Sequence, residues 1–485
     1  MRFNYKVIVN VLGLLLLLNG AFMMLCIPFS LHFDDGDLVP LLKSGGITMV
    51  VGYIAFILTR KNKSKELKKK DGYLIVTLGW LAMSAFGTLP YMLSGAIPNF
   101  TDAFFETISG FTTTGATILT DIEAVDKGIL FWRSLTQWIG GMGIIVLAVA
   151  ILPILGIGGM QLFVAEAPGI TPDKLKPRIT ETAKRLWLIY VGLTLTEVVL
   201  LWLGGMTFYD AINHALTTMA TGGFSTKNAS VAYYESPYIQ YVITLFMFLA
   251  GTNFTMTYFG LHGKFMTVYR NEEFRFYAGF CILLTAICAI SLYNRSGLGV
   301  EQSFRDALFQ VVSIITTTGY VTADYSQWAS SIVVLMFVMM FFGASAGSTA
   351  GGVKIVRHII LFKNSILELK RQLHPSAIIP VRLNKKAVHR DITFNILAFI
   401  MIYISIFAIG SVLMAWIGTD FLTAIGSVAT CLGNIGPGLG QVGPVDNFSE
   451  IPALGKWCLS FLMLLGRLEL FTVLILLTPY FWRKI

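Results

Sequence analysis

The stretch DAFFETISGFTTTG, from Asp102 to Gly115, returns in outline three more times along the chain. Each copy opens with an Asp and has a Gly thirteen positions later, at the end of a short polar run. A constant offset in four places predicts one structural unit that is used four times. The other copies are DAINHALTTMATGG (Asp210 to Gly223), DALFQVVSIITTTG (Asp306 to Gly319) and DFLTAIGSVATCLG (Asp420 to Gly433).

The composition places these units in a membrane. Of the 485 residues, 55% are hydrophobic and 13% are charged, and several apolar runs exceed the ~18 residues that indicate a bilayer-spanning helix. The formal net charge of +9 could suggest a nucleic-acid partner. The basic residues cluster in short segments between apolar runs, however, as expected of cytoplasmic loops. We therefore predict an integral membrane protein in contact with the lipid bilayer, and no nucleic acid.

The apolar runs predict an all-α fold with ten transmembrane helices and both termini on one side. The two most basic segments, Arg60 to Lys70 and Lys363 to Arg390, fall on the same side as the termini. The positive-inside rule assigns that side to the cytoplasm. The helices are expected near residues 7–28, 44–60, 73–95, 130–152, 184–205, 237–262, 274–294, 328–362, 392–416 and 456–480.

Two N-terminal helices and a basic loop (1–70) are expected to precede four pore repeats of span, short re-entrant helix and span. Asp is a favoured N-cap, so each re-entrant helix should begin at its Asp. About ten helical residues cover only ~15 Å, half of the hydrocarbon core, so the chain must dip in and return. The expected repeats are 71–165, 166–270, 271–375 with an intramembrane loop, and 376–485; the N-caps are Asp102, Asp210, Asp306 and Asp420.

The glycine loops that follow these helices are Thr112 to Thr117, Ala220 to Ser225, Thr316 to Val321 and Thr430 to Gly436. Glycine can take φ > 0 and turn successive carbonyls in one direction, and Thr hydroxyls add further oxygens. Rings of carbonyls replace the hydration shell of a monovalent cation, and converging helix C-termini also favour a cation. Alternatively, Gly and Thr here only allow close helix packing.

Four tandem units of this kind on one polypeptide resemble the TrkH/KtrB/HKT superfamily of potassium translocators. The two extra N-terminal helices and the segment RQLHPSAIIPVRLN (Arg371 to Asn384) make the chain similar to the TrkH branch. The resemblance implies K⁺ ions in a filter, with no covalent cofactor. The implied filter residues are Thr112, Thr113, Thr114, Gly115, Ala220, Thr221, Gly222, Gly223, Thr316, Thr317, Thr318, Gly319, Thr430, Cys431, Leu432, Gly433 and Asn434.

The fourth loop departs from the pattern, because Cys431 and Leu432 stand where the other loops have Thr or small residues. K⁺ and Rb⁺ should therefore pass with limited discrimination against Na⁺. The resemblance further implies channel-like K⁺ uptake across the bacterial inner membrane, a homodimer, and a TrkA-like cytosolic nucleotide-binding regulator. The regulator should dock on the basic surfaces of Arg60 to Lys70, Pro168 to Arg185 and Lys363 to Arg390.

The segment FFGASAGSTAGGVKIVR (Phe341 to Arg357) falls within an expected span but is rich in residues that weaken a helix. Each Gly weakens a helix by ~1 kcal/mol relative to Ala, which predicts a flexible plug. The alternative is a packing face of small residues spaced by four. The resemblance favours a plug that occludes the pore, formed by Gly343, Ser345, Gly347, Ser348, Thr349, Gly351 and Gly352.

Arg467 lies near the centre of the last apolar run, where an Arg costs about 2.5–3.5 kcal/mol on insertion scales. Either it points into the pore as an electrostatic barrier, or it forms a buried ion pair with Glu469 or another acid. The resemblance favours the barrier.

No catalytic constellation is present, so an enzyme is not predicted. The six His are scattered, and His214 is expected to be a packed or hydrogen-bonded core residue. The rival hypothesis is a secondary transporter coupled to H⁺ or Na⁺ (symport), because broken helices near the midplane fit that class as well.

Overall fold

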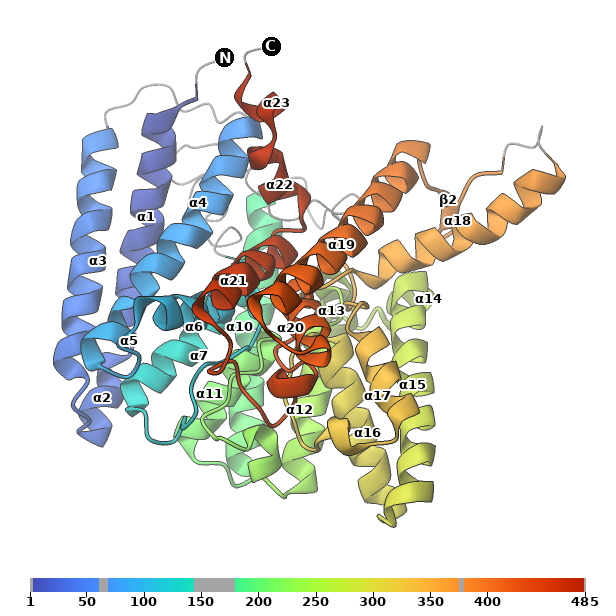
Figure 1. Cartoon of the computed structure of the whole chain (residues 1–485), viewed down its shortest axis with the longest axis horizontal. Coiled ribbons are helices and arrows are strands. Elements are labelled where there is room, and N and C mark those ends of the chain that lie inside the picture. The colour runs from blue at the N-terminus through green and yellow to red at the C-terminus, as the bar shows by residue number, and fades with distance from the viewer. Residues whose placement is uncertain (1–2, 61–68, 144–178, 375–378, 484–485) are drawn as a thin grey trace.

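The computed structural model describes residues 3–60, 69–143, 179–374 and 379–483. It is a bundle of helices in which α1 (Tyr5–Met24), α3 (Leu38–Thr59) and α4 (Lys69–Gly87) form one edge (Figure 1). Small residues bring α1 and α3 together, since a Cβ on Gly13 would lie only 2.8 Å from the carbonyl oxygen of Gly52. The turn helix α2 (Ile27–Phe33) joins the two.

The remaining elements repeat an order of long helix, short helix and a second helix. The first set is α4, α5 (Leu89–Ser94), α6 (Phe100–Phe111) and α7 (Lys127–Gly141). The second is α10 (Ile179–Leu203), α11 (Phe208–Met219), η1 (Ser230–Tyr233), α12 (Pro237–Ala250), α13 (Phe254–Leu261) and α14 (Phe265–Arg270). The third is α15 (Glu272–Ser296), α16 (Val300–Ile315), η2 (Tyr325–Gln327), α17 (Ser330–Met339) and α18 (Ile355–Leu373), which projects from the bundle (Figure 1).

The fourth set begins with the chain's described strands, β1 (Arg382–Leu383) and β2 (Lys386–Ala387), which pair antiparallel. It continues with α19 (Arg390–Ile417), α20 (Phe421–Gly433), η3 (Gly440–Val442), α21 (Ala453–Arg467), α22 (Phe471–Leu477) and α23 (Pro479–Trp482). The all-α membrane fold is confirmed. The residue limits of the four repeats stay a prediction.

Within the described ranges, six helical segments are long and apolar enough to cross a membrane, or up to eight if each bent pair counts as one span. The count of ten therefore stays a prediction. The expected span at 130–152 enters residues 144–178, which lie outside the described residues. The two ends of the described chain meet, because the rings of Phe3 and Phe481 lie 5.5 Å apart. Lys70, at the start of α4, also donates to the Phe481 carbonyl (2.8 Å).

Three expected spans are wrong as continuous helices. α12 and α13 are bent by 111° at residues 251–253, and α21 and α22 by 120° at residues 468–470. The span at 328–362 is interrupted between α17 and α18 by residues 340–354, here named the intramembrane loop. Hydropathy does not register these breaks, because the residues that make them, including Glu469 and Leu470 with φ of 53° and 56°, lie inside apolar sequence. The predicted loss of helix at Gly343 to Gly352 is confirmed.

The N-cap prediction is confirmed for Asp420 and wrong for Asp102, Asp210 and Asp306. The Asp420 carboxylate accepts from two backbone N–H groups at the start of α20 (3.1 and 3.2 Å). Asp102 and Asp210 lie in the first turn of their helices, where a carboxylate still complements the helix dipole. Asp306 lies inside α16, which begins at Val300.

Other residues cap the helices where Asp does not. The side chains of Asn99 and Thr207 accept backbone hydrogen bonds at the starts of α6 and α11 (2.8 and 3.1 Å). A short polar side chain three residues before the Asp therefore fills the cap position, and the chain enters each helix one turn earlier than expected.

Candidate functional site

The four short helices α6, α11, α16 and α20 all end in glycine loops with one shared backbone conformation. In each loop a non-glycine residue with φ near +55° is followed, two positions later, by a glycine that also has positive φ. Positive φ is uncommon for Thr, so its recurrence marks a constrained structure. The pairs are Thr113 (53°) and Gly115 (81°), Thr221 (53°) and Gly223 (76°), Thr317 (56°) and Gly319 (80°), and Asn434 (54°) and Gly436 (102°).

These glycines close the four loops into a ring. A Cβ placed on each would collide with, or press closely on, the carbonyl oxygen of the residue that precedes the glycine of the next loop. The contacts pass from the first loop to the second, third and fourth and return to the first. The pairs are Gly115 with Gly222, Gly223 with Thr318, Gly319 with Ile435, and Gly436 with Thr114.

This ring corrects the register of the fourth loop. Thr430, Cys431 and Leu432 belong to α20, and the residue equivalent to Gly115 is Gly436, not Gly433. The error arose because Asp420 caps its helix while the other Asp residues do not, so the thirteen-residue offset selects a different position. The sequence did hold a signal for Gly436, because Asn434 is among the residues that best tolerate φ > 0 and stands two positions before it, as Thr113 stands before Gly115.

Eight backbone carbonyl groups of these loops lack protein partners. They belong to the eight residues at positive φ in the ring, and they accept no hydrogen bond from any residue that the structure describes. Their four non-glycine members are fully buried. Buried carbonyls are nearly always paired, so a ring of unpaired carbonyl oxygens indicates a position for a cation or for water.

Side chains behind the ring hold the loops in place. Thr112 and Thr114 share a hydrogen bond between their hydroxyls (2.8 Å), and Thr316 and Thr318 repeat it (2.8 Å). Asn434 Nδ2 donates to Thr114 Oγ1 (2.9 Å), which joins the fourth loop to the first. The Thr hydroxyls in these pairs therefore hydrogen-bond within the loop. Sequence reasoning had expected Thr hydroxyls to contact the ion.

The intramembrane loop lies directly against the ring. The backbone N–H of Gly351 donates to Thr317 Oγ1 (2.7 Å), and a Cβ on Gly351 would lie 2.8 Å from the Gly433 carbonyl oxygen. Thr349 Oγ1 donates to the carbonyls of Met219 and Ala250 (3.0 and 3.2 Å). The loop is thus attached to the second, third and fourth sets of helices.

The rest of the loop is fixed where α12 breaks. Ser345 N–H donates to the Gly251 carbonyl, and the Gly347 carbonyl accepts from Phe254 N–H (3.0 Å each). Ser348 Oγ donates back to the Ser345 carbonyl (2.6 Å). Gly343 and Gly352 pack together at the neck of the loop, where Gly343 N–H donates to Val353 (2.8 Å).

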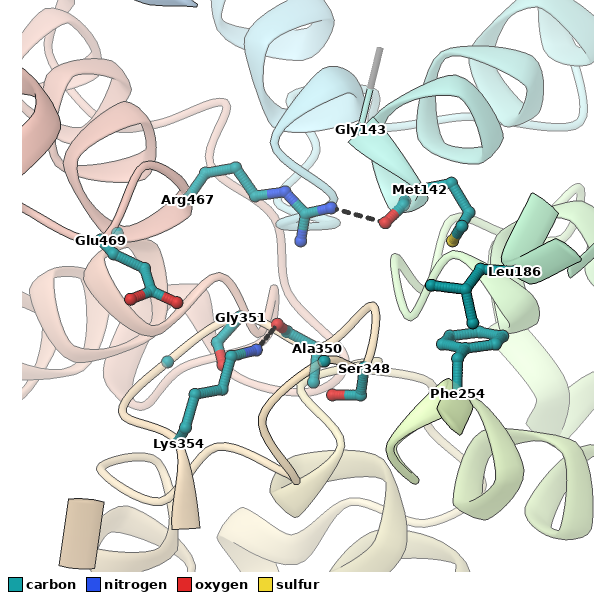
Figure 2. Close-up of a pocket in the computed structure, with 14 residues that line it drawn as sticks. Met142, Gly143, Leu186, Phe254, Ser348, Ala350, Gly351, Lys354, Arg467 and Glu469 are labelled. Atoms are coloured by element: carbon teal, nitrogen blue, oxygen red, sulfur yellow. Dashed lines mark hydrogen bonds between the residues drawn. The ribbon is translucent and has the colours of Figure 1, made fainter. Parts of the chain in front are cut away.

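Arg467 extends across a cavity of about 190 Å³ beside this loop (Figure 2). Its guanidinium donates to the carbonyls of Thr349 (2.7 Å) and Gly141 (2.9 Å), and also to that of Gly140. Carbonyls from α7 and from the intramembrane loop therefore bind this Arg, and the cavity is lined by both. Arg467 therefore lines a cavity, and its role as an electrostatic barrier stays a prediction.

Two further charged groups line this cavity, and sequence reasoning had named Glu469 but missed Lys354. Lys354, at the end of the intramembrane loop, points to the same cavity as Arg467 and donates to the Ala350 carbonyl (Figure 2). Glu469 forms its ion pair with Arg357 at the start of α18. The signal for Lys354 was present, since an ionisable residue inside an apolar run is a candidate for a functional role.

His214 is a hydrogen-bonded core residue, as expected. Its Nδ1 contacts the Asp210 carbonyl (2.8 Å), and its Nε2 contacts Ser225 Oγ (2.9 Å). The side chain is fully buried.

Four re-entrant helices whose loops close one ring, inside a bundle of apolar helices, define a pore-loop membrane protein. Residues 42–483 match the model of the TrkH family, described as a cation transport protein. The chain belongs to the TrkH family. It is 42% identical to the "Trk system potassium uptake protein TrkH" of Escherichia coli K12 over 490 aligned residues, which cover 99% of this chain and 100% of the relative.

Two further relatives agree with this assignment. The "Trk system potassium uptake protein TrkG" of Escherichia coli K12 is 32% identical, with 99% of each chain covered. The crystal structure of the potassium transporter TrkH from Vibrio parahaemolyticus superposes with a TM-score of 0.89 at 39% identity, and covers 99% of this chain and 100% of that one. The resemblance to the TrkH branch is confirmed.

Proposed function

We propose that the chain is a channel-like potassium uptake translocator and that its four glycine loops form the ion filter. The observation that carries the proposal is the ring of eight buried or half-buried loop residues whose carbonyls have no described protein partner. Oxygen atoms in such a ring substitute for the water around an alkali cation, and four helix C-termini favour positive charge there. The names of its relatives in the Trk potassium uptake systems support K⁺ as the cargo.

The filter admits K⁺ and Rb⁺ with limited discrimination against Na⁺. Its fourth quadrant differs from the first and third, because Gly433, Asn434 and Ile435 replace three threonines. An unequal quadrant weakens the fit to one ion radius. The K⁺ ions are cargo held by backbone oxygens, and the proposal needs no covalent cofactor.

Uptake is gated below the ring by the intramembrane loop and Arg467. The loop is bound to the ring at Gly351 and to Arg467 at Thr349, so it blocks the route that the ions must take. The positive charges of Arg467 and Lys354 oppose a passing cation in the same cavity.

Gly351→Ala should weaken the closed gate. The added Cβ would lie 2.7 Å from Asn434 Cβ and 2.8 Å from the Gly433 carbonyl, so the loop must move away from the ring. We expect the basal flux of radioactive Rb⁺ into proteoliposomes to rise several-fold. Such a rise corresponds to a shift of about 1 kcal/mol in the equilibrium between the closed and the open gate. Gly260→Ala, where a Cβ meets open space, is the matched control. A flux equal to wild type would contradict the contact between loop and ring as a gate.

The side of the chain that carries both described ends faces the cytoplasm of a bacterial inner membrane, and the chain works there as a homodimer with a TrkA-like cytosolic nucleotide-binding regulator. The Lys and Arg residues of the basic surfaces named above support this orientation and provide the docking surface. Residues 61–68, 168–178 and 375–378 of these surfaces lie outside the described residues.

Docking of the regulator should depend on salt. Replacing Lys370, Arg371, Lys385 and Lys386 by Gln removes four charges from the third basic surface. Exposed charges interact over a Debye length of ~8 Å at physiological salt, so the affinity should fall at least tenfold in a pull-down titration and further in high salt. Binding that is equally tight in 1 M salt, where the Debye length is about 3 Å, would refute the docking proposal.

One flux experiment tests the main proposal. Proteoliposomes with outward K⁺, Rb⁺ or Na⁺ gradients should show uptake of radioactive Rb⁺ that K⁺ suppresses more than Na⁺ does, without any imposed proton gradient. The breaks in α12/α13 and α21/α22 also suit a secondary transporter coupled to H⁺ or Na⁺. Flux that stops when the proton or Na⁺ gradient is collapsed would favour that alternative.

A further inference from the structure

A buried ion pair stands behind the ring, in the first set of helices. Arg133 on α7 donates from Nε to Glu106 on α6 (2.7 Å), and the two side chains are 2% and 0% exposed. Removing two charges from water in a membrane protein is expensive, so such a pair needs a function that outweighs the desolvation.

The pair does not stand alone, because each partner also contacts the chain just after a ring glycine. Glu106 accepts from Thr117 Oγ1 and from the backbone N–H of Ile118 (2.9 Å each). These residues follow Gly115 in the first glycine loop. Every carboxylate oxygen of Glu106 is therefore used.

Arg133 reaches the second glycine loop instead. Its Nη1 donates to the Ser225 carbonyl (2.9 Å), and its guanidinium carbon lies 3.5 Å from the ring centre of Phe224. One turn further along α7, Gln137 donates to the Gly222 carbonyl (2.6 Å) and accepts from Phe224 N–H (3.0 Å). Side chains of α7 thus hydrogen-bond to the second loop on both sides of Gly223.

The other repeats show that charge is not needed to build the unit. At the position of Glu106 the second and third repeats have His214 and Gln310, which contact the same part of their own loops. The fourth repeat has Ser427 there. Gly140 packs on the Phe111 carbonyl at the end of α6, and Gly466 packs on the Leu432 carbonyl near the end of α20. This equivalence makes Leu459 the counterpart of Arg133 in the fourth repeat.

We infer that Glu106 and Arg133 are positioning residues that clamp the first glycine loop to the second and thereby set the spacing of carbonyl oxygens in that half of the filter. The inference rests on the proposed function of the ring. Because the pair is fully buried and spans two loops, its loss lets these loops separate and reduces the preference for K⁺ over the smaller Na⁺.

The test copies the fourth repeat into the first, with Glu106→Ser and Arg133→Leu in one chain. The double variant leaves no buried charge unpaired, and it uses side chains that the same fold already accepts at these positions. The readout is the ratio of Rb⁺ to Na⁺ flux in proteoliposomes, which does not depend on how much protein is folded. We expect this ratio to fall about tenfold. The ion pair of the exposed Glu301 (58%) with Arg305, which lies away from the four glycine loops, supplies the control Glu301→Gln, with a ratio equal to wild type.

A double variant that conducts with the wild-type ratio overturns the inference. If the double variant yields no folded protein, as judged by its elution in detergent, the decision passes to Arg133→Lys. The Lys ammonium keeps the charge beside Glu106, but it cannot also donate to the Ser225 carbonyl as the Arg133 guanidinium does. The ratio of Rb⁺ to Na⁺ flux must therefore still fall. An unchanged ratio in Arg133→Lys overturns the inference, whereas a wild-type chain without K⁺ preference would overturn the proposed function itself.

Discussion

Gly319→Ala is expected to reduce K⁺ and Rb⁺ flux by at least about a hundredfold, equivalent to ~2.7 kcal/mol. Gly319 has φ of 80°, and a Cβ there would collide with the Ile435 carbonyl oxygen of the next loop. The third and fourth loops would have to separate, which opens the ring at that side. Radioactive Rb⁺ uptake in proteoliposomes measures the loss.

Gly279→Ala is the matched control for this change. Gly279 lies in α15 and a Cβ there meets open space, so the flux should remain at the wild-type level. The same assay tests the corrected register of the fourth loop. Gly436→Ala, at φ of 102°, should lower flux far more than Gly433→Ala, which has no positive φ. Equal effects at both sites would contradict the ring as described.

Arg467→Met should raise the basal flux at least about thirtyfold. A unit charge ~8 Å from the ion path opposes a cation by about 2 kcal/mol at an effective dielectric constant of ~20. The change also removes the hydrogen bond to Thr349 (2.7 Å), which holds the intramembrane loop. Both losses act in the same direction.

Arg467→Lys separates the two contributions, because it keeps the charge but cannot bind Thr349 and the α7 carbonyls together. A low flux in the Lys variant and a high flux in the Met variant would assign the barrier to charge. Flux at the wild-type level in Arg467→Met would remove this residue from the gate.

The fourfold repeat could be predicted from the sequence alone, because a backbone at positive φ favours glycine strongly. Gly115, Gly223 and Gly319 recur at a fixed distance from an Asp, and that spacing survived in three repeats. It failed in the fourth, where Asp420 takes the cap position that Asn99 and Thr207 fill elsewhere.

The breaks in the second helices were only partly readable. Four glycines in the sequence indicate the intramembrane loop. α21, by contrast, ends at Arg467 inside an apolar run, and the break there depends on tertiary contacts that the local sequence does not reveal. The support of a loop by a neighbouring repeat was not readable at all. Arg133 and Gln137 hold a loop about ninety positions away, and nothing in the local pattern of α7 names that partner.

The hydrogen bond between Asn434 and Thr114 joins residues 320 positions apart. The first loop is synthesised well before the fourth, so it gains this contact only after the fourth loop has been made. A chain with only three repeats would lack one side of the ring, because the fourth loop contacts both the third and the first. The ring of loops closes only when these distant parts of the chain come together.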